Sequence, residues 1–130
     1  MLLIRHSSPV KVTAAPDGVV LRAPSIADTV ELGRLYYASY PPGVACDTEA
    51  AAIEDIRVTF DGEYGPLSLT KSLLAVASQT LVGAVLVVDR APWPNTPDCP
   101  FIIELFTAPA VRRQGLAKTL LTTCLQHPTD

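Results

Sequence analysis

The sequence predicts one α+β domain, and three observations support that fold class. The chain has 130 residues, of which 48% are hydrophobic and 18% charged, the composition of one globular domain with one core. Leucine- and valine-rich segments on either side of Ser78-Gln79-Thr80 indicate a β-hairpin. Three other segments carry apolar residues at helical spacing. The predicted order is strand, two helices, three strands and a helix, without an internal repeat, which is an α+β or α/β pattern.

Charge and cysteine usage exclude several classes of protein. There are 13 acidic and 10 basic side chains, a net charge of −3, so we expect no nucleic-acid partner and no membrane partner. Cys46, Cys99 and Cys124 are far apart, which fits a reducing cytoplasm better than a disulfide framework or a zinc knuckle. His6 and His127 have no neighbours at metal-ligand spacing, so we expect no metal.

The first half of the chain predicts an extended arm, a strand and two helices. Residues 1–18 have no sustained period and form the arm, and 19–22 form a short strand. Ser25, with Asp28 three residues later, is typical of a helix start, and this helix must end by Tyr40 because two prolines follow. Asp47 can cap a second helix from 48 to about 60.

The second half predicts a hairpin, a strand and a third helix. The hairpin comprises 72–78 and 81–89, and Gly83 in it marks a bulge or a close backbone approach. A proline-rich surface loop, 91–100, leads to a strand at 101–107. An amphipathic helix is predicted to begin at Gly115, with one apolar face and one solvent-facing face. The apolar residues are Leu116, Leu120, Leu121, Cys124 and Leu125, and the wet ones Lys118, Thr119, Thr122 and Thr123.

The turn before the third helix has the features of an anion site. The first N–H groups of a helix have no partner within it and carry the positive end of its dipole, and Gly115 lets a ligand approach the backbone. Arg112, Arg113 and Lys118 concentrate positive charge there in an acidic chain. Two solvated arginines before a helix are the alternative explanation.

The same segment resembles the acetyl-CoA-binding motif of the GNAT N-acyltransferase superfamily. The similarity consists of the strand, Thr107-Ala108-Pro109, then Arg112-x-x-Gly115-x-Ala117 and a leucine-rich helix. Residues 19–28 resemble the family's first strand and first helix start, and 80–83 its second-to-third strand turn. The match spans residues 19–126. It implies a GNAT-like domain over 19–130, with a mixed, mostly antiparallel sheet flanked by helices, preceded by the arm at 1–18.

The resemblance also implies a cofactor site. Acetyl-CoA is the expected co-substrate, with its pyrophosphate on the backbone of Arg113, Gln114, Gly115, Leu116 and Ala117 and added charge from Arg112 or Arg113. Main-chain N–H groups around Phe106 and Thr107 would pair with pantetheine and polarise the thioester carbonyl, since fixed donors stabilise the oxyanion that forms.

Glu104 is the candidate catalytic base. It is the one charged side chain in the strand 101–107, and burial there raises the pKa of a carboxyl toward the range useful for deprotonating an ammonium acceptor. A structural carboxylate paired with an arginine, or lying at a wet edge, is the alternative. Tyr36 and Tyr40 are candidate substrate-binding residues, with core packing as their alternative.

An acidic segment lies between the two tyrosines and the hairpin. Residues 47–63 hold six acids against one base, so a cationic acceptor could be steered there, although a solvated helix face explains the same pattern. The acids are Asp47, Glu49, Glu54, Asp55, Asp61 and Glu63, and the base is Arg57.

The chain departs from the family's pattern after the third helix. GNAT domains continue with another strand and a helix, which often supplies a tyrosine as general acid, and no residue here can be assigned that role. The domain is therefore expected to be incomplete at its C-terminus, leaving an unpaired apolar edge at 101–107. We expect self-association through this edge as a homodimer, pairing with a second polypeptide, or a fragment of a longer enzyme.

Two main functions follow. The first is an acetyl-CoA-dependent N-acetyltransferase that modifies a primary amine of a small molecule or peptide by direct attack. The alternative is a non-catalytic module that keeps only the acyl-CoA-binding half and serves in assembly or regulation. A structural interaction domain without a ligand is a third possibility.

Overall fold

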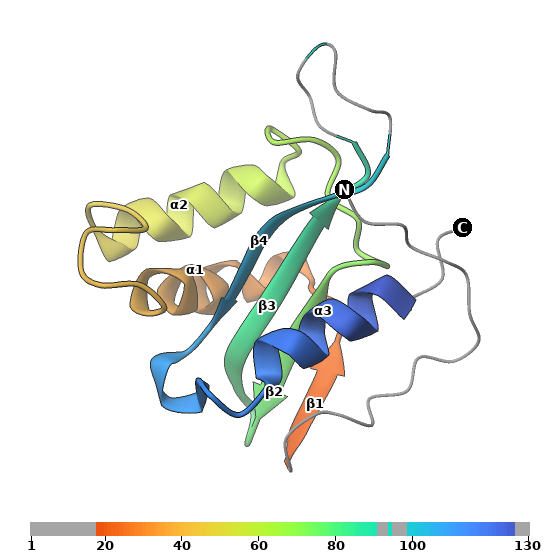
Figure 1. Ribbon diagram of the computed structural model, residues 1–130. Helices are drawn as coiled ribbons and strands as arrows, with labels where there is room; N and C mark the ends of the chain where they lie inside the picture. Colours follow the sequence, from red (N-terminus) through yellow and green to blue (C-terminus); the bar gives the residue numbers. More distant parts are fainter. Residues whose placement is uncertain (1–17, 91–93, 95–98, 127–130) are drawn as a thin grey trace.

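The computed structural model describes residues 18–90, 94 and 99–126, which form a four-stranded antiparallel sheet with helices on both faces (Figure 1). The strands are β1 (Val19–Arg22), β2 (Leu73–Ala77), β3 (Thr80–Val88) and β4 (Phe101–Thr107), in that order across the sheet. The predicted α+β class is confirmed, and so are the bounds of β1 and β4. The predictions for the arm before Gly18, for most of the loop 91–100, and for His6 and His127 lie outside the described residues.

Three α-helices cover the sheet. Helices α1 (Thr29–Ala38) and α2 (Glu49–Phe60) lie on one face and α3 (Leu116–Gln126) on the other, with short 3-10 turns η1 (Ile26–Asp28) and η2 (Pro109–Val111) before α1 and α3 (Figure 1). Each face has its own apolar cluster. Strand β3 contributes to both clusters and is buried at every position after Thr80, because helices cover it on both sides.

Glycines allow the closest approaches between elements. A Cβ at Gly83 would lie 3.1 Å from Leu120 Cδ1 of α3, so side chains, and not another backbone segment, approach this glycine closely. The β2–β3 register also shifts beside it, which places an irregularity next to the same residue. At Gly33 a Cβ would lie 2.4 Å from the Ile53 Cα, so α1 and α2 cross where no side chain fits.

Two details of the helices differ from prediction. Thr48, not Asp47, caps α2, because its side-chain oxygen accepts from the Ala51 N–H at 3.1 Å. Thr119 and Thr123 are buried rather than on the wet face of α3. The Thr119 hydroxyl donates to the Gly115 carbonyl at 3.0 Å, and this bond inside the helix lets a threonine face the sheet.

Strand β4 carries a bulge in the segment that matters for function. Its register with β3 passes from Leu86↔Glu104 to Val87↔Ile102, which leaves Ile103 as an extra residue. Ile102 packs with the α3 cluster, whereas Ile103 packs with the cluster under α1 and α2. The extra residue therefore presents Ile103 and Glu104 to the same side of the sheet.

Candidate functional site

Two hollows open along β4, and each contains residues from different elements. The first, which we call the α3 pocket, has a volume of about 270 Å³ and is lined by Thr107, Val111, Arg112, Arg113, Gly115, Leu116, Ala117 and Lys118. The second, the α2 cleft, has a volume of about 470 Å³ and is lined by Tyr36, Asp55, Ile56, Thr59, Tyr64, Phe101, Ile102, Ile103 and Glu104. Gln114 belongs to the turn before α3 but does not line its pocket.

The turn at the α3 pocket exposes its backbone. Arg113 and Gly115 both have positive φ, 67° and 79°, and a Cβ at Gly115 would meet no atom within 4 Å. Within the described chain, the main-chain N–H groups of residues 113–118 have no protein acceptor within hydrogen-bonding distance. Free amides at a helix start, open to a pocket, are suited to binding phosphate oxygens.

Positive side chains surround these amides, but they are not equivalent. Arg113 and Lys118 are exposed and form no ion pair with any described residue. The Arg112 guanidinium, by contrast, donates from Nη2 to the main-chain oxygen of Ser39 at the end of α1. Arg113 and Lys118 are therefore free to meet an anion, whereas Arg112 already joins two elements.

The outer edge of β4 offers main-chain groups next to the α3 pocket. The Ala108 N–H donates to the Val82 carbonyl at 2.8 Å, and antiparallel pairs alternate between bonded and non-bonded positions. Phe106 accordingly pairs its backbone with Ala84 on β3, while the backbone groups of Leu105 and Thr107 face outward. The Phe106 ring packs against Tyr36, with ring centroids 5.3 Å apart.

Glu104 lies in the α2 cleft, half-buried and without an ion pair among the described residues. Burial raises the pKa of its carboxyl, and the negative charge of Asp55 raises it further, while a hydrogen bond with Tyr36 acts in the opposite direction. The structural alternative of pairing with an arginine finds no partner in the described part of the chain, and the alternative of a solvent-exposed edge remains open. A carboxylate with a raised pKa in a cleft is suited to accept a proton.

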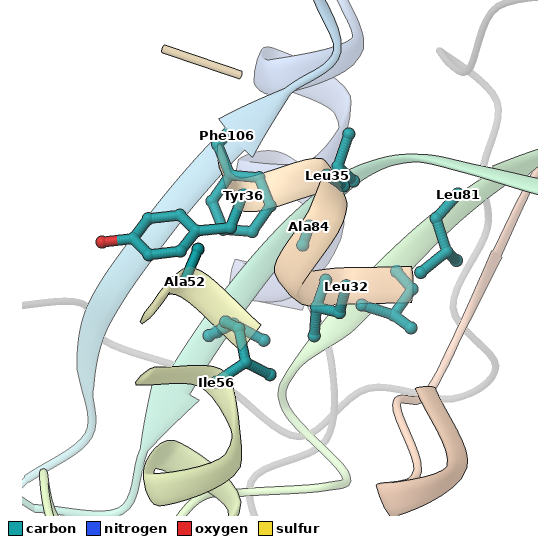
Figure 2. Close-up of a cluster of buried hydrophobic side chains, with 10 residues drawn as sticks. Leu32, Leu35, Tyr36, Ala52, Ile56, Leu81, Ala84 and Phe106 are labelled. Atoms are coloured by element: carbon teal, nitrogen blue, oxygen red, sulfur yellow. The ribbon is translucent and has the colours of Figure 1, made fainter. Parts of the chain in front are cut away.

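Tyr36 joins the apolar core to this cleft. Its ring packs among Leu32, Leu35 and Phe106, and Figure 2 shows its hydroxyl pointing away from the cluster. Burial raises the pKa of Tyr36, and the charge of Glu104 adds to the effect, so the phenol stays protonated and can donate. Tyr40 does not line the cleft. It packs edge-to-face on Tyr36, with ring centroids 6.0 Å apart.

Asp55 and Tyr64 complete the polar wall of the cleft. Sequence reasoning named Asp55 only as one of six acids in 47–63, and it did not name Tyr64. The Tyr64 hydroxyl donates to Asp55 Oδ1 at 2.5 Å, which raises the pKa of this phenol to about 12. One signal for Asp55 was available, because it is three residues after Ala52 and one before Ile56, both buried, and therefore borders the packed face of α2. No local pattern marked Tyr64, since it follows the helix in a loop.

Two features are absent from the residues that the structure describes. They contain no group of three or more histidine, cysteine, aspartate or glutamate side chains placed to hold a metal ion. None of the helices among them has the length and apolar character needed to cross a membrane.

Solved acetyltransferases share this fold. Diaminobutyrate acetyltransferase from Paenibacillus lautus, solved with its substrate and coenzyme A, is 20% identical with a TM-score of 0.56, over 84% of this chain and 57% of that one. A putative GNAT acetyltransferase from Desulfovibrio desulfuricans is 19% identical with a TM-score of 0.55, over 80% and 61%. An aminoglycoside N-acetyltransferase in complex with CoA is 20% identical with a TM-score of 0.57, over 85% and 70%.

The chain therefore spans less than two thirds of the length of the first two of these proteins. No curated protein matched the sequence. The model of the acetyltransferase (GNAT) family matches residues 32–129, which is most of the chain. This range includes every residue that lines the two hollows. With the fold and the sequence in agreement, the chain belongs to the GNAT acetyltransferase family.

Proposed function

We propose that the protein transfers an acetyl group from acetyl-CoA to a primary amine of a small molecule or peptide. The observation that carries the proposal is that β4 joins the two hollows. Glu104 lines the α2 cleft and Thr107 lines the α3 pocket. Three residues along a strand span ~10 Å, so an acyl group at the edge of β4 can meet an amine that enters from the cleft.

The α3 pocket is proposed to hold the cofactor. The free amides of residues 113–117 bind the pyrophosphate, with added charge from Arg113 and Lys118. The outward N–H groups of Leu105 and Thr107 pair with pantetheine and polarise the thioester carbonyl. Two of the related structures contain coenzyme A, which supports this class of ligand.

The α2 cleft is proposed to hold the amine. Glu104 removes a proton from the ammonium, either directly or through water, and the neutral nitrogen attacks the thioester carbonyl carbon. A C–N bond forms, the C–S bond breaks, and the nitrogen loses a second proton while the leaving thiolate takes up one proton. The named substrates of two relatives, diaminobutyrate and aminoglycosides, are amines, which supports the acceptor class.

Calorimetry with CoA tests the cofactor site. Gly115→Val fills the open space over the amides and is expected to abolish binding. Gly18→Val is the matched control, since Gly18 has the same kind of backbone, with φ of 81°, and also has nothing within 4 Å. CoA at a hundred times its dissociation constant should stabilise the wild type by about 2.7 kcal/mol. Binding that survives Gly115→Val contradicts the site.

A thiol-release assay with a panel of amines then tests transfer. Release of CoA in the presence of an amine supports the transferase. Binding without release with any amine supports the alternative, a non-catalytic module that retains the cofactor site.

The outer edge of β4 is also proposed to mediate self-association, as a homodimer. Among the described strands none pairs with this edge, and unpaired apolar edges recruit other strands. Sedimentation equilibrium over a concentration series is expected to show association. A stable monomer at high concentration contradicts it.

A further inference from the structure

The α2 cleft holds two carboxylates that no described cation of the protein neutralises. Asp55 comes from α2 and Glu104 from β4, and neither forms an ion pair with a described residue. Arg57, the base nearest to Asp55 in sequence, pairs instead with Glu54 and Asp61, at 2.5 and 2.6 Å. The remaining lining residues are apolar or carry hydroxyl groups. The cleft therefore has two acids and no base.

Asp55 is held in place with one oxygen left over. Tyr64 donates to Oδ1 at 2.5 Å, and within the described chain Oδ2 has no partner. The adjoining Ile56 and the nearby Thr59 are buried, so the carboxylate borders a packed surface. Asp55 is half-buried and lines the cleft, so its carboxylate is accessible to a molecule bound there.

The proposed transfer uses only one of these acids. When Glu104 takes the proton of the reacting ammonium, its own charge and that of the amine are both neutralised. Asp55 then remains as a second carboxylate in the same cleft, contributed by α2 and not by β4. An acceptor with a single nitrogen leaves this charge unpaired, whereas a second ammonium on the acceptor neutralises it.

We propose that the natural acceptor carries two cationic nitrogens, of which Glu104 deprotonates one while Asp55 binds the other through Oδ2. This inference rests on the proposed function and names its substrate class as diamines and related compounds with a second basic nitrogen. Asp55 is a specificity-determining residue in this arrangement, and Tyr64 positions its carboxylate.

Matched substrates provide the first test. Linear α,ω-diamines of increasing length are compared with n-alkylamines of the same length in the thiol-release assay. The best diamine is expected to exceed its matched monoamine in kcat/KM by about tenfold or more, the effect of one charge-assisted hydrogen bond. Equal values for both classes at every length overturn the inference and leave the transferase intact.

Variants assign the effect to Asp55. Asp55→Asn is expected to raise KM for the best diamine about tenfold more than it raises KM for the matched monoamine, because only the diamine has a second ammonium for Oδ2 to bind. Tyr64→Phe should produce a smaller rise, because the ring remains and only the hydrogen bond to Oδ1 is lost. Glu54→Gln is the control, since it removes the same charge from the exposed side of α2. An equal effect of Glu54→Gln shows general electrostatics and overturns the assignment.

A binding measurement separates the two ideas if transfer fails. Calorimetry of the best-binding diamine is carried out on the CoA-loaded protein. Binding that Asp55→Asn removes supports the subsite even when no thiol is released, a result that counts only against the transferase. The absence of diamine binding to the wild type overturns the inference itself.

Discussion

Arg112 donates a hydrogen bond from Nη2 to the main-chain oxygen of Ser39, which ties the turn before α3 to the end of α1. The last carbonyls of a helix lack partners within it and carry the negative end of its dipole, so a guanidinium stabilises this terminus twice over. Tyr36, three residues earlier, lines the α2 cleft. The two hollows thus share this connection as well as β4.

Arg112→Ala is expected to affect both hollows. It should weaken CoA binding, raise KM for the amine and lower the free energy of unfolding by about 1 kcal/mol. Arg113→Ala should weaken CoA binding alone, because Arg113 forms no hydrogen bond or ion pair with another element among the described residues. Calorimetry, steady-state kinetics and urea unfolding measure the three effects. Identical profiles for the two variants would show that the bond to Ser39 has no role in the site.

Glu104→Gln is expected to lower kcat by roughly 10²- to 10⁴-fold, the usual contribution of a general base. In the wild type kcat/KM should fall as the pH drops through the pKa of Glu104, which lies above the ordinary value of 4.5. The pH–rate profile measures this fall in kcat/KM. If the Glu104→Gln variant shows the same fall at low pH as the wild type, Glu104 is not the general base.

The same substitution should stabilise the fold at neutral pH. The folded-state pKa of Glu104 is raised. The contribution of Glu104 to the free energy of unfolding is therefore fully present below the unfolded-state pKa, and it is lost as pH rises through the folded-state pKa. Glutamine stays neutral, so the Tm of the variant should exceed that of the wild type at neutral pH and match it in acid. Thermal unfolding at both conditions tests the sign.

Asp28 should show the opposite pH dependence. Its carboxylate accepts two hydrogen bonds from Arg22, at 2.7 and 2.9 Å, and one from the Ser25 N–H, and the Arg22 bonds are the main reason why its pKa is lowered. Its stabilisation is present above the unfolded-state pKa and is lost as pH falls through the lowered value. Asp28→Asn is expected to cost about 1–3 kcal/mol at neutral pH and less in acid. Urea unfolding at both pH values measures the difference.

Gly33→Ala should destabilise the protein even though alanine favours helices by about 1 kcal/mol over glycine. The added Cβ would lie 2.4 Å from the Ile53 backbone, which forces α1 and α2 apart and costs several times the gain, about 3 kcal/mol. Ala38→Gly, at an exposed position in the last turn of α1, is the control and should cost less than about 1 kcal/mol, because the full propensity cost of glycine applies only inside a helix. Denaturant midpoints compare the two, and a stabilised Gly33→Ala contradicts the close crossing.

Local pattern was sufficient for much of this protein. The bounds of β1 and β4, the hairpin and the order of all elements follow from apolar spacing and turn residues, which act within a few positions of the chain. The turn before α3 is equally local, because free amides, Gly115 and the neighbouring cations are consecutive in sequence. Glu104 could be chosen for the same reason, as the one charge in an apolar strand.

Only the tertiary structure decided the α2 cleft. Asp55, Tyr64 and Glu104 come from a helix, a loop and a distant strand, and no spacing in the sequence records that they meet. The bulge at Ile103 and the rotation of α3 that buries Thr119 and Thr123 likewise depend on the partner element. Burial and charge pairing depend on which segments pack together. The sequence therefore gives the residue types of the cleft but does not show that these residues come into contact.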